Sequence, residues 1–295
     1  MTPQRPPLRP PLRRARGFTL VEAILVIVII GILAAVVALF IRAPILGYRD
    51  AVDRAEITDQ ADLALRRIAR DIRLALPNSV RVVNGSSLEF LQTKTGGRYL
   101  AVDDGVTSLP AFDDPAQTSF TVLAPPDSFG QVATGDRVVV YNLGVAPADA
   151  YGGGNTGVVQ AAPAYSTDAT LGRIATVRLN ANPFAAATPA LPSPTRSFQV
   201  VSGPVSFYCQ DAGDGTQTLM RAWGYAITAT QSAVPNGGQR AIVAARLSNC
   251  NGLFNYDTAA TQRTGLVLVS LELRGRYPDS PAIRLVHQIH VDNTP

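Results

Sequence analysis

The hydrophobic pattern along the chain begins with one long apolar run. Residues 18–41 have the sequence FTLVEAILVIVIIGILAAVVALFI, in which Glu22 is the only charged side chain. A helix that rises about 1.5 Å per residue would extend roughly 36 Å over this run, enough to cross the hydrocarbon core of a bilayer. The run is also longer than the apolar stretch of a typical cleaved signal peptide. The pattern therefore predicts a transmembrane helix over 18–41.

The helical pattern continues beyond the apolar run to Leu76, but there it becomes amphipathic. Apolar and charged residues fall on opposite faces at 3.6 residues per turn. The apolar face has Ile57, Ala61, Leu65, Ile68, Ile72 and Leu76, and the charged face has Asp59, Asp62, Arg66, Arg67, Arg70 and Arg73. An independent coiled coil would need more heptads than the three clear turns present here. We therefore expect one N-terminal helix over 18–76, stopped by Pro77, whose second half packs on an apolar surface.

Beyond Pro77 the chain has short β-rich runs separated by turn residues, with no further helical period. The expected strands are 80–83, 88–91, 120–123, 137–141, 174–179, 198–201, 205–208, 219–226, 242–247, 266–273 and 283–291. Two stretches rich in Ala, Pro, Gly and Thr, 144–170 and 181–195, are predicted to be long loops. The expected fold class is α+β, a long helix packed on a mainly antiparallel sheet.

The positive charge of the chain is concentrated at its N-terminus. The formal net charge is +4, and five arginines precede the first acidic residue, Glu22. Without the first 17 residues the chain has 21 basic and 22 acidic side chains. The basic character thus belongs to a terminal segment and predicts no nucleic-acid partner. Arginines before an apolar run favour a cytoplasmic N-terminus, with the bulk of the chain on the other side of the membrane.

Glu22 is the residue in the apolar run that needs a chemical explanation. An ionisable side chain in a membrane segment is costly without a partner and is a functional candidate by default. No basic residue follows it until Arg42, about twenty positions further on. The partner must therefore come from another chain or from a nearby amine, such as a new N-terminus.

The residues around Glu22 resemble a known processing motif. Their order is Arg16, Gly17, Phe18, Thr19, Leu20, Val21 and Glu22. This order is similar to the prepilin motif of type IV pilins and type II secretion pseudopilins. The resemblance implies that a prepilin peptidase cuts after Gly17, that Phe18 becomes the methylated N-terminus, and that Glu22 pairs with the terminal amine of a neighbouring subunit.

The same resemblance implies the organisation and the partners of the chain. It divides the chain into a leader (1–17), the helix (18–76) and a periplasmic β-rich domain (77–295). The expected partners are prepilin peptidase, other pilins or pseudopilins, and an inner-membrane assembly platform. The expected location is the inner membrane, in a single pass, and then a pilus or pseudopilus. Type IVa major pilins usually have a kinking proline in the second half of the apolar segment. This chain has Leu39 there, and the first proline after residue 18 is Pro44.

Two further stretches, 70–81 and 263–295, are similar to minor pilins of the mannose-sensitive haemagglutinin (MSHA) pilus system. No such similarity covers 85–195. Three functions stay open at this point: a minor pilin, a type II secretion pseudopilin, and a signal-anchored periplasmic binding protein or enzyme that carries the motif by chance.

The two cysteines, Cys209 and Cys250, are candidates for one disulfide. They would close a loop of about 40 residues. In an exported domain such a bond would contribute roughly 3 to 4 kcal/mol on the chain-entropy model. Two buried free thiols are the alternative.

Few residues suggest other chemistry. His287 and His290 are three apart on an expected strand, so they should point to opposite faces and are expected to be structural. The turn 211–215 has two aspartates but lacks the ligand number and terminal Glu of a calcium loop. The glycine-rich stretch 151–155 lacks the Lys and Ser/Thr of a phosphate loop. We expect no enzyme activity, no cofactor and no metal site.

Overall fold

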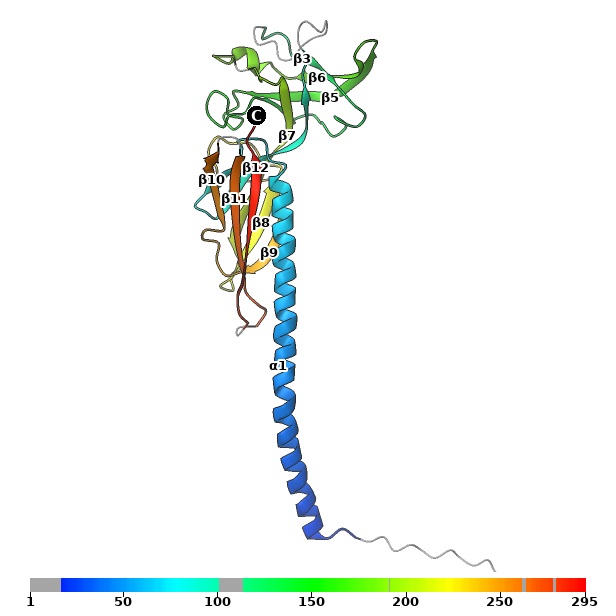
Figure 1. Cartoon of the computed structure of the whole chain (residues 1–295), viewed down its shortest axis with the longest axis vertical. Helices are drawn as coiled ribbons and strands as arrows, with labels where there is room; N and C mark the ends of the chain where they lie inside the picture. The colour runs from blue at the N-terminus through cyan, green and yellow to red at the C-terminus, as the bar shows by residue number, and fades with distance from the viewer. Residues whose placement is uncertain (1–16, 101–113, 191, 262–263, 278–279) are drawn as a thin grey trace, which may run out of the picture. The chain divides into compact units, whose positions relative to one another are not determined.

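The computed structural model describes residues 17–100, 114–190, 192–261, 264–277 and 280–295 (Figure 1). Leader residues 1–16 lie outside the described residues. The chain forms two compact units, Met1–Val52 and Asp53–Pro295. The helix α1 (Leu20–Ile72) begins in the first unit and ends in the second.

The part of α1 in the first unit contains the predicted apolar segment. Among the described residues, α1 is the one helix long and apolar enough to cross a membrane, and no residue of its apolar window is buried in the chain. Pro44 lies inside α1, and the helix continues on both sides of it. A helix interior tolerates a proline only at the loss of one backbone hydrogen bond.

The part of α1 in the second unit has the predicted amphipathic pattern. Ile57, Ala61, Leu65, Ile68 and Ile72 are all buried, which confirms the predicted apolar face. The helix ends at Ile72, four residues before the predicted end at Leu76.

Backbone pairing with strand β2 (Ser87–Arg98) explains this early end of α1. The N–H of Leu76 donates to the carbonyl of Leu91 (2.8 Å), and the N–H of Thr93 donates to the carbonyl of Leu74 (2.8 Å). These bonds satisfy the backbone groups that another helical turn would use. Leu76 is still fully buried, as its place in the apolar pattern predicted.

The described residues form a 12-stranded sheet in which every strand pair is antiparallel, as predicted. The main path runs β10-β11-β9-β8-β7-β4-β5-β6-β3; β2 pairs with β1 and β7, and β12 pairs with β11 (Figure 1). Besides β2, the strands are β1 (Arg81–Val83), β3 (Ser119–Leu123), β4 (Arg137–Val140), β5 (Thr156–Asp168), β6 (Gly172–Leu179), β7 (Ser197–Asp211), β8 (Gln217–Trp223), β9 (Gln239–Leu247), β10 (Phe254–Thr261), β11 (Thr264–Leu273) and β12 (Ile283–Asp292). A short 3-10 helix, η2 (Pro183–Ala186), lies in the predicted loop 181–195.

Three parts of the strand prediction were wrong. The predicted loop 144–170 contains β5, and β10 was not predicted. The two strands expected at 198–201 and 205–208 are the single strand β7, which continues through Gly203 and Pro204. Pro204 keeps its place in the ladder opposite Leu91, and Gly203 has φ +131°, a conformation that other residues rarely adopt.

The second unit has two main hydrophobic cores, and β7 contributes to both. The first core joins the buried face of α1 to residues of β2, β7, β8, β9, β11 and β12, and includes Phe207. The second core joins residues of β3, β4, β5, β6 and β7, and includes Phe198. The Phe198 ring packs edge-on against Phe120, with centroids 5.5 Å apart, and stacks on Phe129 at 6.0 Å.

A buried ion pair joins α1 to the sheet beside the first core. Nε of Arg221 on β8 donates to Oδ2 of Asp71 at 2.7 Å, and both side chains are about nine-tenths buried. The Arg221 guanidinium also lies 4.9 Å from the centroid of the Trp223 ring. The two charges compensate each other in surroundings where either alone would be costly.

A second polar contact holds the start of the packed part of α1. The carboxylate of Asp53, which is buried, accepts a hydrogen bond from the backbone N–H of Arg276 at 3.0 Å, and Glu56 pairs with the Arg276 guanidinium at 3.1 Å. The Ser280 hydroxyl and the Arg276 N–H hold the pKa of Asp53 below its ordinary value. The loop between β11 and β12 is thereby attached to α1 at the first residue of the second unit.

Candidate processing and assembly site

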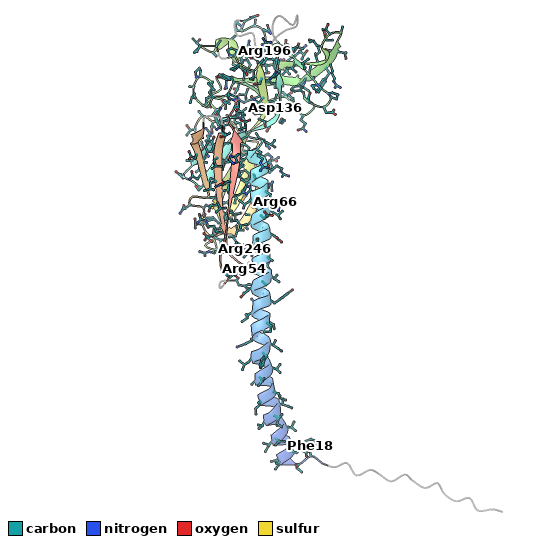
Figure 2. All side chains as sticks on the ribbon, in the orientation of Figure 1. Phe18, Arg54, Arg66, Asp136, Arg196 and Arg246 are labelled. Atoms are coloured by element: carbon teal, nitrogen blue, oxygen red, sulfur yellow. A yellow bond between two sulfur atoms is a disulfide. The ribbon has the colours of Figure 1, made fainter. Side chains whose placement is uncertain are left out.

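The segment 17–19 precedes α1 and has no regular secondary structure. Gly17 and Phe18 are exposed, Phe18 by 72% of its surface (Figure 2). A Cβ atom built on Gly17 would have no heavy atom within 4 Å. The bond between Gly17 and Phe18 is therefore open to an enzyme, and the fold itself does not require glycine at this position.

Thr19 caps the N-terminus of α1. The N–H of Glu22 donates to Oγ1 of Thr19 at 3.3 Å and to its carbonyl oxygen at 3.1 Å, and the N–H of Ala23 donates to the same carbonyl. Threonine followed three residues later by glutamate is the sequence pattern of a capping box. The helix therefore starts after the Gly17–Phe18 bond, and cleavage there would leave its cap in place.

Glu22 lies in the first turn of α1, with its carboxylate exposed. A negative charge is favourable there because the first N–H groups of a helix point toward it. Within the described part of the chain, the Glu22 carboxylate has no ion-pair partner. The Glu22 carboxylate thus lies four residues from Phe18 and can accept a hydrogen bond, or bind a cation, from outside the chain.

The two cysteines are bonded to each other in the structure, with their Cα atoms 6.4 Å apart. Cys209 lies on β7 and Cys250 in the loop after β9, so the bond closes the segment that contains β8 and β9. Cys250 belongs to the first core. The oxidation of this pair in the protein stays a prediction, and mass spectrometry under non-reducing conditions would test it.

The other candidate residues do not come together. His287 and His290 both lie on β12, opposite Val269 and Leu266 on β11, and their odd spacing places them on opposite faces. Asp211 and Asp214 each accept hydrogen bonds from backbone N–H groups two residues further on. In the ranges that the structure describes, no three His, Cys, Asp or Glu side chains form a group that could hold a metal ion.

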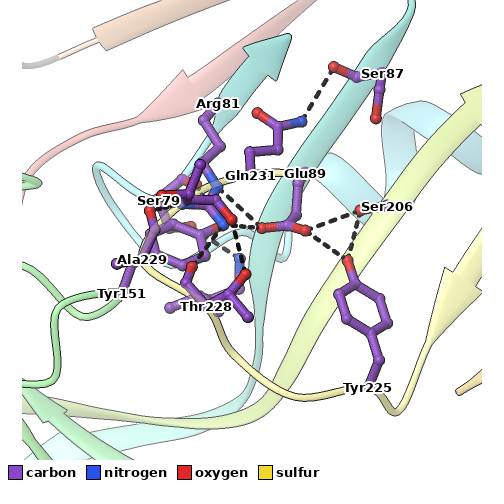
Figure 3. Close-up of polar contacts among 12 residues, drawn as sticks. Ser79, Arg81, Ser87, Glu89, Tyr151, Ser206, Tyr225, Thr228, Ala229 and Gln231 are labelled. Carbon is purple, nitrogen blue, oxygen red and sulfur yellow. Dashed lines mark hydrogen bonds and ion pairs between the residues drawn. The ribbon is translucent and has the colours of Figure 1, made fainter. Parts of the chain in front are cut away.

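A polar network around the buried side chain of Glu89, which the sequence pattern did not reveal, lies on the sheet (Figure 3). Glu89 on β2 accepts hydrogen bonds from Nε of Arg81 (2.9 Å), the hydroxyl of Tyr225 (2.8 Å) and the hydroxyl of Ser206 (3.1 Å). The Arg81 guanidinium lies 3.5 Å from the centroid of the Tyr151 ring. These partners are up to 136 residues apart in sequence, so no local pattern could have indicated them.

The network attaches two loops to the sheet rather than forming a reactive site. Tyr225 follows β8, and Tyr151 precedes β5 and donates to the carbonyl of Ser79 at 2.9 Å. Burial and the nearby Glu89 charge raise the pKa of Tyr151 well above its ordinary value, and burial is also the main cause of the raised pKa of Tyr225. Both carboxylate oxygens of Glu89 have hydrogen-bond donors, which leaves no unpaired base in the network.

The N-terminal segment is the part of the chain that matches a known family model. Residues 12–38 match the model described as the prokaryotic N-terminal methylation motif. The chain carries a prepilin-type methylation motif. The matched range contains Gly17, Phe18 and Glu22. No curated protein and no solved structure matches the chain significantly.

The methylation motif indicates the class of protein to which the geometry around Gly17, Phe18 and Glu22 belongs. It supports a type IV pilin-like or pseudopilin-like protein, and it implies processing by prepilin peptidase and assembly with other pilins. Together with the apolar part of α1 it indicates a membrane-anchored protein. It also favours a structural role over an enzymatic one.

Proposed function

We propose that this chain is a minor pilin subunit of a type IV pilus. In this proposal prepilin peptidase cuts after Gly17, Phe18 becomes the methylated N-terminus, and Glu22 pairs with the terminal amine of a neighbouring subunit. The observation that carries the proposal is the order of three features: an exposed bond outside the helix, a helix cap directly after it, and an unpaired carboxylate in the first turn.

The proposed membrane orientation follows from the charges of the leader. Five arginines precede the apolar run, which favours a cytoplasmic N-terminus and a periplasmic C-terminal domain. The segment 18–41 would cross the inner membrane once. In the periplasm the pair Cys209 and Cys250 would be oxidised.

The pilus system is the finer part of the proposal. The similarity of 70–81 and 263–295 to the MSHA minor pilin MshO favours an MSHA-like pilus, in which this chain would be built in, or would prime or cap the fibre. A pseudopilin of type II secretion is the second candidate, since pseudopilins share the same motif and apolar helix. Both candidates require the same processing at Gly17.

Intact mass of the membrane-extracted protein, produced with and without a prepilin peptidase, tests the proposal. We expect the peptidase to yield a chain that starts at Phe18 and carries one methyl group. A leader that stays attached in the presence of the peptidase would instead favour a signal-anchored periplasmic binding protein or enzyme.

Two substitutions separate processing from assembly. Gly17→Ala should abolish cleavage while leaving the fold intact, because a Cβ has space at this position. Glu22→Ala should be cleaved normally but should lose nearly all incorporation into filaments, measured by immunoblotting of sheared pili. Ile30→Ala, on the same apolar segment, serves as the matched control and should be processed and assembled. Normal assembly of Glu22→Ala would refute the role given to Glu22.

A further inference from the structure

The exposed face of α1 in the second unit carries charges that are sorted by sign. Asp59 and Asp62 come first, and Arg66, Arg70 and Arg73 follow, at intervals of three or four residues. At about 100° per residue, these five positions fall within an arc of about 80° on the helix surface. We call these five residues the charged stripe; Arg66 marks its centre in Figure 2.

The fold of the chain does not account for the charged stripe. Arg66 pairs with Asp62 at 2.8 Å, but the two side chains are 77% and 49% exposed, and an ion pair so exposed to water adds little to the stability of the fold. Asp59, Arg70 and Arg73 are exposed and have no ion-pair partner among the residues that the structure describes. The stripe is thus a charged surface still available to another molecule.

Two exposed leucines border the charged stripe. Leu63 is 67% exposed and Leu74 is 44% exposed. They are eleven residues apart, which is close to three helical turns, so both lie on the same side of the helix. The same interval of eleven residues separates Arg70 from Asp59 and Arg73 from Asp62.

We propose that the charged stripe binds the charged stripe of a second copy of this chain, with the two helices parallel and displaced by eleven residues, roughly 16.5 Å along the axis. This inference rests on the proposed function, because a shared membrane orientation is what makes the two helices parallel. Arg70 and Arg73 of one copy then lie level with Asp59 and Asp62 of the other, and Leu74 lies level with Leu63.

Other displacements fit the charges less well. Without displacement, parallel copies place acid beside acid and arginine beside arginine, which is unfavourable. Shifts of four or seven residues keep the same face in contact but place like charges together. A shift of four residues brings Arg70 level with Arg66, and a shift of seven residues brings Arg73 level with Arg66. The shift of eleven residues pairs both aspartates with arginines and places no arginine of the stripe level with another. A purely acidic partner would complement only the three arginines of the stripe. A helix with both aspartates and arginines in this order, such as a second copy of the chain, complements both ends.

Cross-linking between two copies in the membrane tests the displacement. One copy carries Ala55→Cys and the other Arg66→Cys, two positions on the stripe face that are eleven residues apart and outside the proposed pairs. The copies carry different tags, are co-expressed with prepilin peptidase, and are treated with a bis-maleimide. This reagent modifies free thiols only, so the predicted disulfide between Cys209 and Cys250 would not react. We expect the 55–66 product to exceed the 55–55 and 66–66 products at least fivefold.

Charge reversal then tests whether the stripe causes the contact. Arg70→Asp together with Arg73→Asp, placed in the copy that carries Arg66→Cys, should lower the yield of the 55–66 product at least fivefold. Asp59→Arg with Asp62→Arg in the copy that carries Ala55→Cys should restore it, but only in this combination. Trp223 fluorescence during unfolding checks that each variant keeps its fold.

Three results would overturn the proposal: predominant cross-links between equal positions, no cross-link above background for any pair, or a 55–66 product that charge reversal does not change. The intact mass of the same samples separates these failures from failure of the proposed function. A chain that starts at Phe18 but gives no displaced cross-link counts against the stripe alone, whereas an uncut leader counts against the pilin assignment.

Discussion

The two halves of α1 share one backbone conformation but differ in what determines their side chains. In 20–42 the side chains are almost all apolar, and each is exposed in the isolated chain. In 53–72 buried apolar residues alternate with exposed charged ones, and the buried face belongs to the first core. The first pattern can only be explained by surroundings outside the chain, whereas the second is required by the fold. Truncation of an apolar residue in 20–42 should therefore leave folding unchanged, whereas truncation of a buried residue in 53–72 should alter it.

The largest expected effect on folding is at Asp71. Asp71→Ala leaves the buried Arg221 without its counter-charge, which should cost about 3 to 5 kcal/mol of unfolding free energy. Denaturant unfolding followed by Trp223 fluorescence measures this, since Trp223 is the one tryptophan of the chain. Asp62→Ala is the matched control, because its partner Arg66 is exposed; it should change stability by less than about 0.5 kcal/mol. Equal effects of the two substitutions would contradict the role given to the buried pair.

A smaller effect is expected from an apolar truncation, and it tests the comparison directly. Ile68 is fully buried in the first core, so Ile68→Ala should lower the unfolding free energy by about 3 kcal/mol. Ile30→Ala makes the same chemical change in the exposed apolar half and should leave the Trp223 transition unchanged. A comparable shift for both would mean that the two halves of α1 unfold as one unit.

The smallest expected effect is a loss of stability in alkali that is confined to the second unit. Tyr151 and Tyr225 are partly buried, and their pKa values are raised above the ordinary value near 10. A raised pKa in the folded state means that stability is complete below pH of about 10 and falls as pH rises further, when the unfolded chain ionises first. Tyr151→Phe should reduce the slope of unfolding midpoint against pH in this range. An unchanged slope would show that Tyr151 ionises as readily in the folded chain as in the unfolded one.

Local patterns predicted the elements that depend on local chemistry. The apolar run and the buried face of α1 were found from periodicity and residue type, and the motif around Gly17 from its resemblance to the prepilin motif. The antiparallel β-rich class followed from the short runs and turn residues. In these cases each residue's role depends on neighbours within a few turns of the chain.

The failures concern features set by distant partners. Beyond Val159, β5 has mostly exposed alanine, proline and polar residues, and its pairing with β6 defines it rather than burial. The helix ends at Ile72 because β2 offers hydrogen bonds to the next residues. The pairs Asp71 with Arg221 and Glu89 with Tyr225 join residues 150 and 136 positions apart, which periodicity cannot detect.

The position of the Thr19 cap has a consequence for how a cut chain would stay oriented. Because the cap follows the Gly17–Phe18 bond, removal of the leader changes charge without changing the helix. The five arginines that favour a cytoplasmic N-terminus are lost, and the remaining side chains have a formal charge of −1. The mature chain would then keep its orientation only because a folded polar domain cannot cross the bilayer. The membrane orientation would thus be kinetically trapped, because the leader charges that set it are absent from the mature chain.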